Sequence, residues 1–189
     1  MLFNLKAIAH RVTDDELLQL SNDNPDSKFE TTKEGKLIIM SPTGGTTGGK
    51  NFSLIGQIWY WNEKSKLGIA FDSSTGFKFS DDAVRSPDVS WIKLNRWSQL
   101  TQDQQDKFAP IDPDFVLELR SSTDKLDILQ EKMEEYTDCG VKLGWLINPQ
   151  DKQVEIYRQK QKKEILDSPD TLSGEDVLPG LTLDLTGIL

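Results

Sequence analysis

The chain has 189 residues, and its 36% hydrophobic content indicates a folded protein rather than a disordered one. The formal net charge of −9 argues against binding nucleic acid through bulk charge alone, and the single cysteine, Cys139, excludes a disulfide scaffold. No apolar run in the sequence reaches the roughly 20 residues of a membrane span. Residues 1–10 lack the pattern of a signal peptide, so we expect a cytoplasmic protein without a membrane partner.

The first third of the sequence predicts two helices separated by a hairpin. Thr13 and Glu16 have the spacing of a capping box, which marks the start of a helix. The glycine-rich stretch 44–49 lacks the Gly-Lys-Ser/Thr of a P-loop, and we expect it to be a flexible loop over a cleft. Gly68 is expected to end the second helix. Apolar spacing and turn residues place these elements at 14–20 (helix), 29–31 with 36–40 (hairpin) and 50–66 (helix).

The rest of the sequence alternates short apolar segments with turns and one further long helix, expected at about 124–138. The unit 115–147 should form a right-handed parallel crossover. The order of elements predicts an α/β fold in which a mixed β-sheet is flanked by helices, with additional β-hairpins. We expect one domain over residues 1–189, with a short helical arm at about 1–25. The predicted strands are 69–71 with 77–79 (a second hairpin), 87–92, 115–119, 141–147, 152–158 and an edge strand at 178–185.

Two acidic residues occur in segments that otherwise have the pattern of buried strands. Asp88 precedes the apolar segment 89–92, and Glu118 interrupts the apolar segment 115–119. A carboxylate there is costly unless it is paired, hydrogen-bonded or bound to metal. Glu118 shares a strand face with Arg120, so an ion pair with that residue, or exposure at a sheet edge, is one explanation. Two such acids at one site would instead need a cation between them, and Mg²⁺ or Mn²⁺ suits these oxygen ligands.

The helix expected at 124–138 places one lysine beside its apolar side. Leu129, Met133 and Tyr136 form an apolar stripe, and Lys132 lies on the flank of that stripe. One explanation is that the stem of Lys132 covers apolar surface while its ammonium group reaches water. The other is a cation aimed at the acidic residues, where it could orient an attacking water or stabilise negative charge on a phosphate.

Other common kinds of site have little support in the sequence. His10 is the only histidine, so a Ser-His-Asp or Cys-His site would depend on a residue near the N-terminus. Cys139 has no companion for a structural zinc site. Trp59 and Trp61 lie on the long helix and suit a core or an interface, so this helix could serve a homodimer.

Several short fragments, each weak alone, occur in an order and spacing that resemble one family. Over residues 13–189 the chain resembles the Uma-type restriction endonucleases, formerly a domain of unknown function, within the PD-(D/E)XK nuclease superfamily. The fragments are Met40-Ser41-Pro42, Ser86-Pro87-Asp88-Val89, residues 115–121, 129–136 and 144–149, Val154-Glu155-Ile156-Tyr157 and Val177-Leu178-Pro179-Gly180.

The resemblance implies a restriction-endonuclease-like fold and metal-dependent hydrolysis of phosphodiester bonds, with nucleic acid, expected to be DNA, as a transient partner. It implies that Asp88 and Glu118 are ligands of Mg²⁺ or Mn²⁺ and that the backbone carbonyl of Leu119 adds a further oxygen. Glu30 matches an acidic position of the family and would support the cluster.

The sequence departs from the superfamily pattern at one position. Arg120 stands two residues after Glu118, where the superfamily has lysine. The resemblance implies that Lys132, on the following helix, supplies this group instead. The catalytic residues expected from the sequence are therefore Asp88, Glu118, Lys132 and Glu30.

Two other functions are consistent with the same residues. The first is a non-catalytic binding module that keeps the nuclease fold, suggested by the acidic charge and by Arg120. The second is an assembly protein in which Asp88 and Glu118 pair only with arginines, such as Arg85, Arg96 or Arg120. A fold alone cannot choose among these functions.

Overall fold

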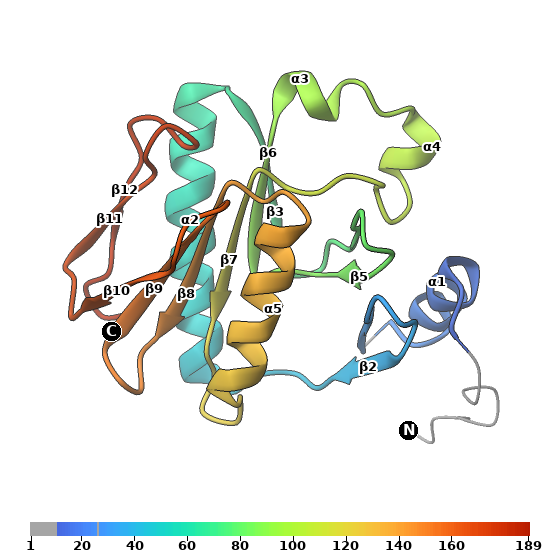
Figure 1. Ribbon diagram of the computed structural model, residues 1–189, viewed down its shortest axis with the longest axis horizontal. Helices are drawn as coiled ribbons and strands as arrows, with labels where there is room; N and C mark the ends of the chain where they lie inside the picture. Colours follow the sequence, from blue (N-terminus) through green and yellow to red (C-terminus); the bar gives the residue numbers. More distant parts are fainter. Residues whose placement is uncertain (1–10, 26) are drawn as a thin grey trace.

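The main sheet has six strands in the order β10-β9-β8-β7-β6-β3 (Figure 1). The computed structural model describes residues 11–25 and 27–189, so the prediction for His10 lies outside the described residues. Strands β7 and β8 are parallel, as expected for the 115–147 crossover, and the other neighbours are antiparallel. The strands are β3 (Gly68–Asp72), β6 (Val89–Lys93), β7 (Phe115–Leu119), β8 (Leu143–Asn148), β9 (Gln153–Arg158) and β10 (Glu164–Asp167).

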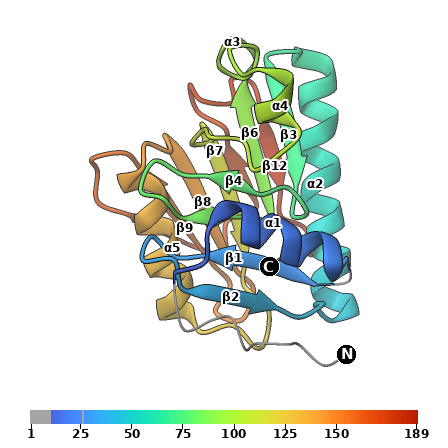
Figure 2. The ribbon, with the colours of Figure 1, turned by 90° about the vertical axis from the view of Figure 1, so that its right-hand side faces the viewer.

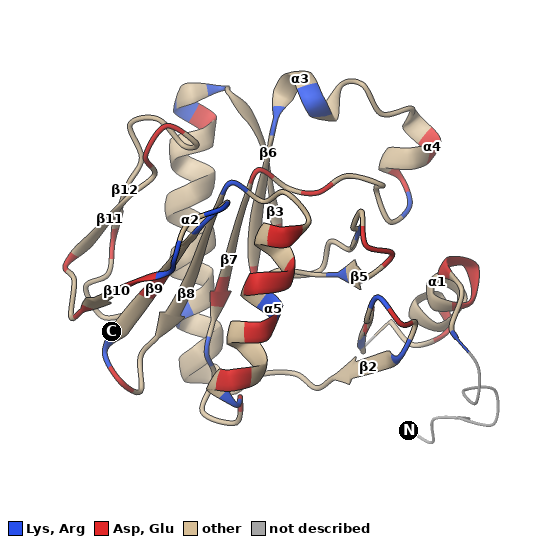
Figure 3. Ribbon diagram, in the orientation of Figure 1, with Lys and Arg blue, Asp and Glu red and all other residues tan. Residues whose placement is uncertain are grey.

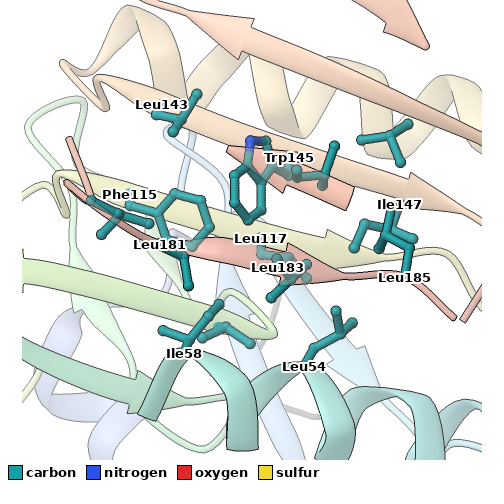
Figure 4. Packing of buried hydrophobic residues seen from close by; sticks show 14 of the residues in the cluster. Leu54, Ile58, Phe115, Leu117, Leu143, Trp145, Ile147, Leu181, Leu183 and Leu185 are labelled. Carbon is teal, nitrogen blue, oxygen red and sulfur yellow. The ribbon is translucent and has the colours of Figure 1, made fainter. Parts of the chain in front are cut away.

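Two long helices cover opposite faces of this sheet (Figure 1). Helix α2 (Gly45–Ser65) buries Leu54 and Ile58 in a core with strand residues of one face and with the C-terminal segment (Figure 4). Helix α5 (Leu126–Asp138) buries Met133 and Tyr136 in a second core on the other face. The apolar stripe predicted for the second of these helices is therefore confirmed, and it sets which side of α5 faces the sheet.

A smaller sheet, in the order β2-β1-β5-β4, lies beside the main one (Figure 2). The predicted first hairpin is confirmed as β1 (Lys28–Thr31) and β2 (Leu37–Met40). Helix α1 (Asp14–Asp23) begins at the predicted capping box and buries Leu17 against Phe29. The remaining strands are β4 (Phe77–Lys78) and β5 (Val84–Arg85).

The other elements are short and lie outside the two sheets. Two single-turn helices follow β6 in the chain. Within residues 11–25 and 27–189, no helix combines the length and the apolar character that crossing a bilayer requires. These elements are α3 (Leu94–Trp97), α4 (Gln102–Gln105), β11 (Thr171–Ser173) and β12 (Thr182–Asp184).

Three predictions about the chain after the first hairpin are wrong. Segments 69–71 and 77–79 do not form a hairpin, because β3 pairs with β6 in the main sheet and β4 pairs with β5 in the smaller one. The glycine-rich stretch is not a loop: helix α2 begins at Gly45, because packing of its later turns lets the helix continue back through the glycines. The expected edge strand at 178–185 shortens to β12, which pairs with β11.

The prediction that Gly68 ends helix α2 is also wrong. Lys66 ends the helix in the left-handed conformation, with φ of 53°, and Gly68 begins β3 instead. A Cβ at position 68 would clash with the Trp91 ring and with the carbonyl oxygen of Ile92. The glycine is therefore needed for the close approach of β3 to β6.

Gly68→Ala should destabilise the protein by about 1–3 kcal/mol, because the added methyl group forces β3 away from β6. Urea unfolding followed by circular dichroism measures this change. Gly49→Ala is the matched control: it lies within α2, where a Cβ meets nothing within 4 Å, and should be neutral or stabilising by up to about 1 kcal/mol. Equal stabilities for the two variants would contradict this account of Gly68.

Candidate active site

Glu118 lies in the middle of the main sheet, on the face covered by α5. It is 5% exposed, and its neighbours on β7 are all buried. The hydroxyl of Tyr136 donates a hydrogen bond of 2.8 Å to Glu118 Oε1, and the ammonium group of Lys132 lies 2.9 Å from the same oxygen. Neither explanation based on an edge strand or on Arg120 is correct, because β7 is a central strand and Arg120 pairs with Asp151.

Lys132 lies between two carboxylates from different parts of the chain. Its Nζ is 2.9 Å from Glu118 Oε1 and 3.0 Å from Glu30 Oε1. Its side chain is 13% exposed, so the ammonium group does not reach out into water, and the snorkelling explanation is wrong. The pKa of Lys132 is raised because its two carboxylate partners outweigh the effect of burial, and it carries a positive charge at neutral pH.

Asp88 approaches the same strand from the segment just before β6. The backbone N–H of Leu119 donates a hydrogen bond of 2.8 Å to Asp88 Oδ2, which fixes this carboxylate beside the residue that follows Glu118. The N–H and C=O of one strand residue point to the same side of the strand, so the Leu119 carbonyl also points toward the Asp88 side. Burial raises the pKa of Asp88, against the hydrogen bond from Leu119 and the attraction of Lys132.

Glu30 joins the smaller sheet to this site. It is 2% exposed on β1 and accepts a hydrogen bond of 2.9 Å from the backbone N–H of Ser86, two residues before Asp88. Burial alone would raise its pKa, but Lys132 and Arg85 outweigh burial and hold the pKa of Glu30 below its ordinary value. Glu30 is therefore ionised and fixes both Lys132 and the chain leading to Asp88.

Arg85 and Glu135 are structural partners of the site that sequence reasoning missed as a pair. Arg85 donates hydrogen bonds of 2.7 and 2.8 Å from Nε and Nη2 to the two oxygens of Glu135, and Nη1 lies 3.2 Å from Glu30 Oε2. The bidentate contact with Glu135 joins β5 to α5, and the contact with Glu30 joins β5 to β1. Only the position of Arg85 near Asp88 in the sequence pointed to a role for Arg85 at the site. Nothing in the sequence indicated Glu135 as its partner, because Glu135 is not part of the predicted apolar stripe of α5.

The charges at the site are unequal, and this asymmetry sets which carboxyl binds a proton. Glu118 shares Lys132 with Glu30, but only Glu30 also contacts Arg85 and a backbone N–H. Burial, with smaller contributions from Asp88 and Glu30, therefore raises the pKa of Glu118 to about 7 against the attraction of Lys132. Of the two glutamates, Glu118 is the one that changes charge near neutral pH.

The arginines considered as partners of the two acids bind other groups. Arg85 pairs with Glu30 and Glu135, and Arg96 pairs with Asp114. Arg120 contacts Asp151 and Asn148. Among the ion pairs of residues 11–25 and 27–189, none joins these arginines to Asp88 or Glu118, so the arginine pairing that the assembly-protein explanation required is wrong.

The donor set suits a hard divalent cation. In the described part of the chain, no group of three or more His, Cys, Asp or Glu side chains is placed to hold a metal, so a metal here would rely on two carboxylates and backbone oxygen. The hydrogen bonds and ion pair of Glu118 go to Oε1, and that of Asp88 goes to Oδ2. Asp88 and Glu118 repel each other's negative charge, and a cation would relieve this repulsion.

The fold and the family comparison together place this chain in a class of nuclease-like α/β proteins. A family profile, Uma2, described as "Putative restriction endonuclease", matches residues 14–186, and the chain therefore belongs to the Uma2 family. The predicted restriction-endonuclease-like fold is likewise confirmed. The chain is similar in structure to a protein described as a "putative nuclease belonging to DUF820" from Anabaena variabilis ATCC 29413. That similarity has a TM-score of 0.76 at 24% sequence identity and covers 94% of this chain and 97% of the other. A comparison with curated proteins found no match.

The raised pKa of Glu118 predicts a pH-dependent stability. A carboxyl whose pKa rises on folding stabilises the folded state fully below its unfolded pKa of 4.5, and this contribution is lost as pH rises through about 7. In metal-free buffer, the free energy of unfolding of the wild type relative to Glu118→Gln should therefore fall by roughly 3 kcal/mol between pH 4.5 and pH 8. Urea titrations across this range test it, and a constant difference would show that Glu118 titrates normally.

Arg85→Met should destabilise the protein by about 3–5 kcal/mol, because it removes both hydrogen bonds to the half-buried Glu135 and one of the two ion pairs of the buried Glu30. Arg85→Lys should recover only part of the loss, since an ammonium group cannot bind both oxygens of Glu135 in the same way. Thermal and urea unfolding measure both variants. Arg120→Met, which removes a more exposed ion pair, is the control and should cost less than about 1 kcal/mol.

Proposed function

We propose that this protein is a metal-dependent nuclease that hydrolyses phosphodiester bonds, with DNA as its substrate. The observation that carries the proposal is the convergence of Lys132 and Glu118 beside Asp88 at the ends of two central strands. Its membership of the Uma2 family supports a nuclease. The expected homodimer and the expected cytoplasmic location remain predictions.

In this proposal, Asp88, Glu118 and the Leu119 carbonyl hold Mg²⁺ or Mn²⁺, because hard oxygen ligands suit these ions. The bound ion would supply a more acidic water and would stabilise negative charge on the phosphate. Lys132 orients the attacking water or neutralises the developing charge, and Glu30 holds the Lys132 ammonium in place.

Arg120 does not take the role of the usual superfamily lysine in this proposal. Its guanidinium group donates to Asn148, to Asp151 and to the backbone carbonyl of Asp124. Lys132 instead reaches Glu118 from the neighbouring helix. An ammonium group can therefore serve the site although its position in the sequence differs from the common pattern.

Cleavage of plasmid and oligonucleotide DNA tests the proposal. Activity should require Mg²⁺ or Mn²⁺ and should disappear with EDTA, since the carboxylates need the ion to act. Asp88→Ala, Glu118→Ala and Lys132→Ala should each lower the cleavage rate by about 10²–10³-fold or more. Glu131→Gln is the control, because Glu131 lies on the exposed side of α5 and should cleave at the wild-type rate.

Two results of this experiment would contradict the assignment. Cleavage that survives all three alanine substitutions would place the chemistry elsewhere in the chain. Binding of DNA without cleavage, under all metal conditions, would favour the alternative of a non-catalytic binding module. The acidic net charge, −9, is the observation that keeps this alternative under test.

A further inference from the structure

The side of α2 that faces away from the main sheet carries three exposed aromatic residues. Phe52, Trp59 and Tyr60 are 78%, 57% and 61% exposed, whereas Leu54 and Ile58 of the same helix are buried. Positions seven and eight residues apart lie two turns along one side of a helix, or about 10–12 Å apart. Large aromatic groups grouped on one exposed helix face mark a binding surface.

The surface between these rings is open. Gly56 lies one turn from Phe52 and one turn from Tyr60, and a Cβ added at Gly56 would meet nothing within 4 Å. Phe52 and Tyr60 therefore flank a slot that has no side chain of its own. A flat group could lie over Gly56 against either ring, because aromatic faces attract other flat, polarisable groups.

A hollow of about 310 Å³ lies beside this helix face, between α2 and the β3–β6 edge of the main sheet. Ile55 and Trp59 line it on the helix side, and β3 with Val89 lines it on the sheet side. Val89 directly follows Asp88 and pairs in register with Asp72 at the end of β3. The hollow therefore ends at the residue that follows the predicted metal ligand, Asp88, in the chain.

The charge of this region is opposite to that of the whole protein. Residues 28–66 contain six lysines and three glutamates, a net charge of +3 in a chain of −9. The lysines lie on α2 and on the β1–β2 hairpin (Figure 3). Lys64 lies over the ring of Tyr60, with its Nζ 5.3 Å from the ring centroid. Positive charge beside exposed rings, as at Lys64 and Tyr60, is complementary to a polyanion that carries flat bases.

We propose that this aromatic face of α2 binds unpaired bases of the nucleic acid, so that the substrate is a strand with single-stranded character. Stacking on an aromatic ring requires an accessible base face, and in a duplex the neighbouring bases cover both faces. A second copy of the chain is the less favoured occupant, because two segments of charge +3 would repel each other. The inference rests on the proposed function for its choice of substrate class, but binding alone can test it.

The experiment measures binding in EDTA, so that no cleavage is needed. The probes are a fluorescently labelled 12-nucleotide DNA strand of mixed sequence and the duplex of the same sequence, followed by fluorescence anisotropy. The wild type should bind the single strand at least about 5-fold more tightly than the duplex. Phe52→Ala and Trp59→Ala should each weaken single-strand binding by at least about 5-fold.

Two control variants separate stacking from a general loss of apolar surface. Phe52→Tyr keeps the ring and should bind within about 2-fold of the wild type, because stacking needs only the aromatic face. Ile165→Ala removes a side chain that is 48% exposed on β10, on the opposite edge of the main sheet, and should leave binding unchanged. Circular dichroism checks that all variants remain folded.

Two outcomes would overturn the inference. The first is single-strand binding that Phe52→Ala and Trp59→Ala leave unchanged, or a wild type that prefers the duplex. The second is a dimer in sedimentation velocity that Phe52→Ala dissociates, which would assign the face to contact between two copies. A protein that binds the single strand through these rings but never cleaves it would remove the nuclease proposal and leave this inference standing.

Discussion

The shared ammonium group of Lys132 is the interaction on which the arrangement of the site depends. Glu30 and Glu118 are both buried, and the Lys132 ammonium group pairs with each of them. Lys132 and Arg85 together stabilise the negative charge of the buried Glu30. Glu30 comes from β1, Glu118 from β7 and Lys132 from α5. The cluster therefore joins the smaller sheet, the main sheet and a covering helix through charge rather than through apolar packing alone.

Arg85 completes this constraint from the other side of Glu30. Glu30 pairs with both Arg85 and Lys132, whereas Glu118 pairs with Lys132 alone. The pKa values of the two carboxyls therefore move in opposite directions. The same difference is useful to a site that binds a cation. Glu30 stays charged and fixes the geometry, whereas Glu118, near Asp88, gains most from a further positive charge.

The two faces of the main sheet carry different kinds of side chain. The α5 face holds the charged cluster around Glu118, and the α2 face holds the larger apolar core. Helix α2 needs only one side for that core, so its other side is free to display aromatic rings and lysines. Asp88 lies just before the start of β6, next to Val89, which packs in the core on the α2 side.

Local patterns in the sequence predicted the elements whose signals are contained within a few residues. The capping box at Thr13, the strand around Glu118 and the face of Lys132 on its helix all agree with the structure. Periodicity and capping are local properties of the chain, so they can be read without knowing the fold. The fragments that resemble the Uma-type family identified the same protein class that the family comparison confirms.

Tertiary structure decided which distant residues meet. Segments 69–71 and 77–79 looked like a hairpin, but β3 pairs with β6 because the Gly68 backbone can approach Trp91 closely. Arg85 pairs with Glu135, and Lys132 pairs with both Glu30 and Glu118. The partners in these pairs are between 14 and 102 positions apart in the sequence. Such contacts follow from packing of whole elements, and no periodicity along the chain records them.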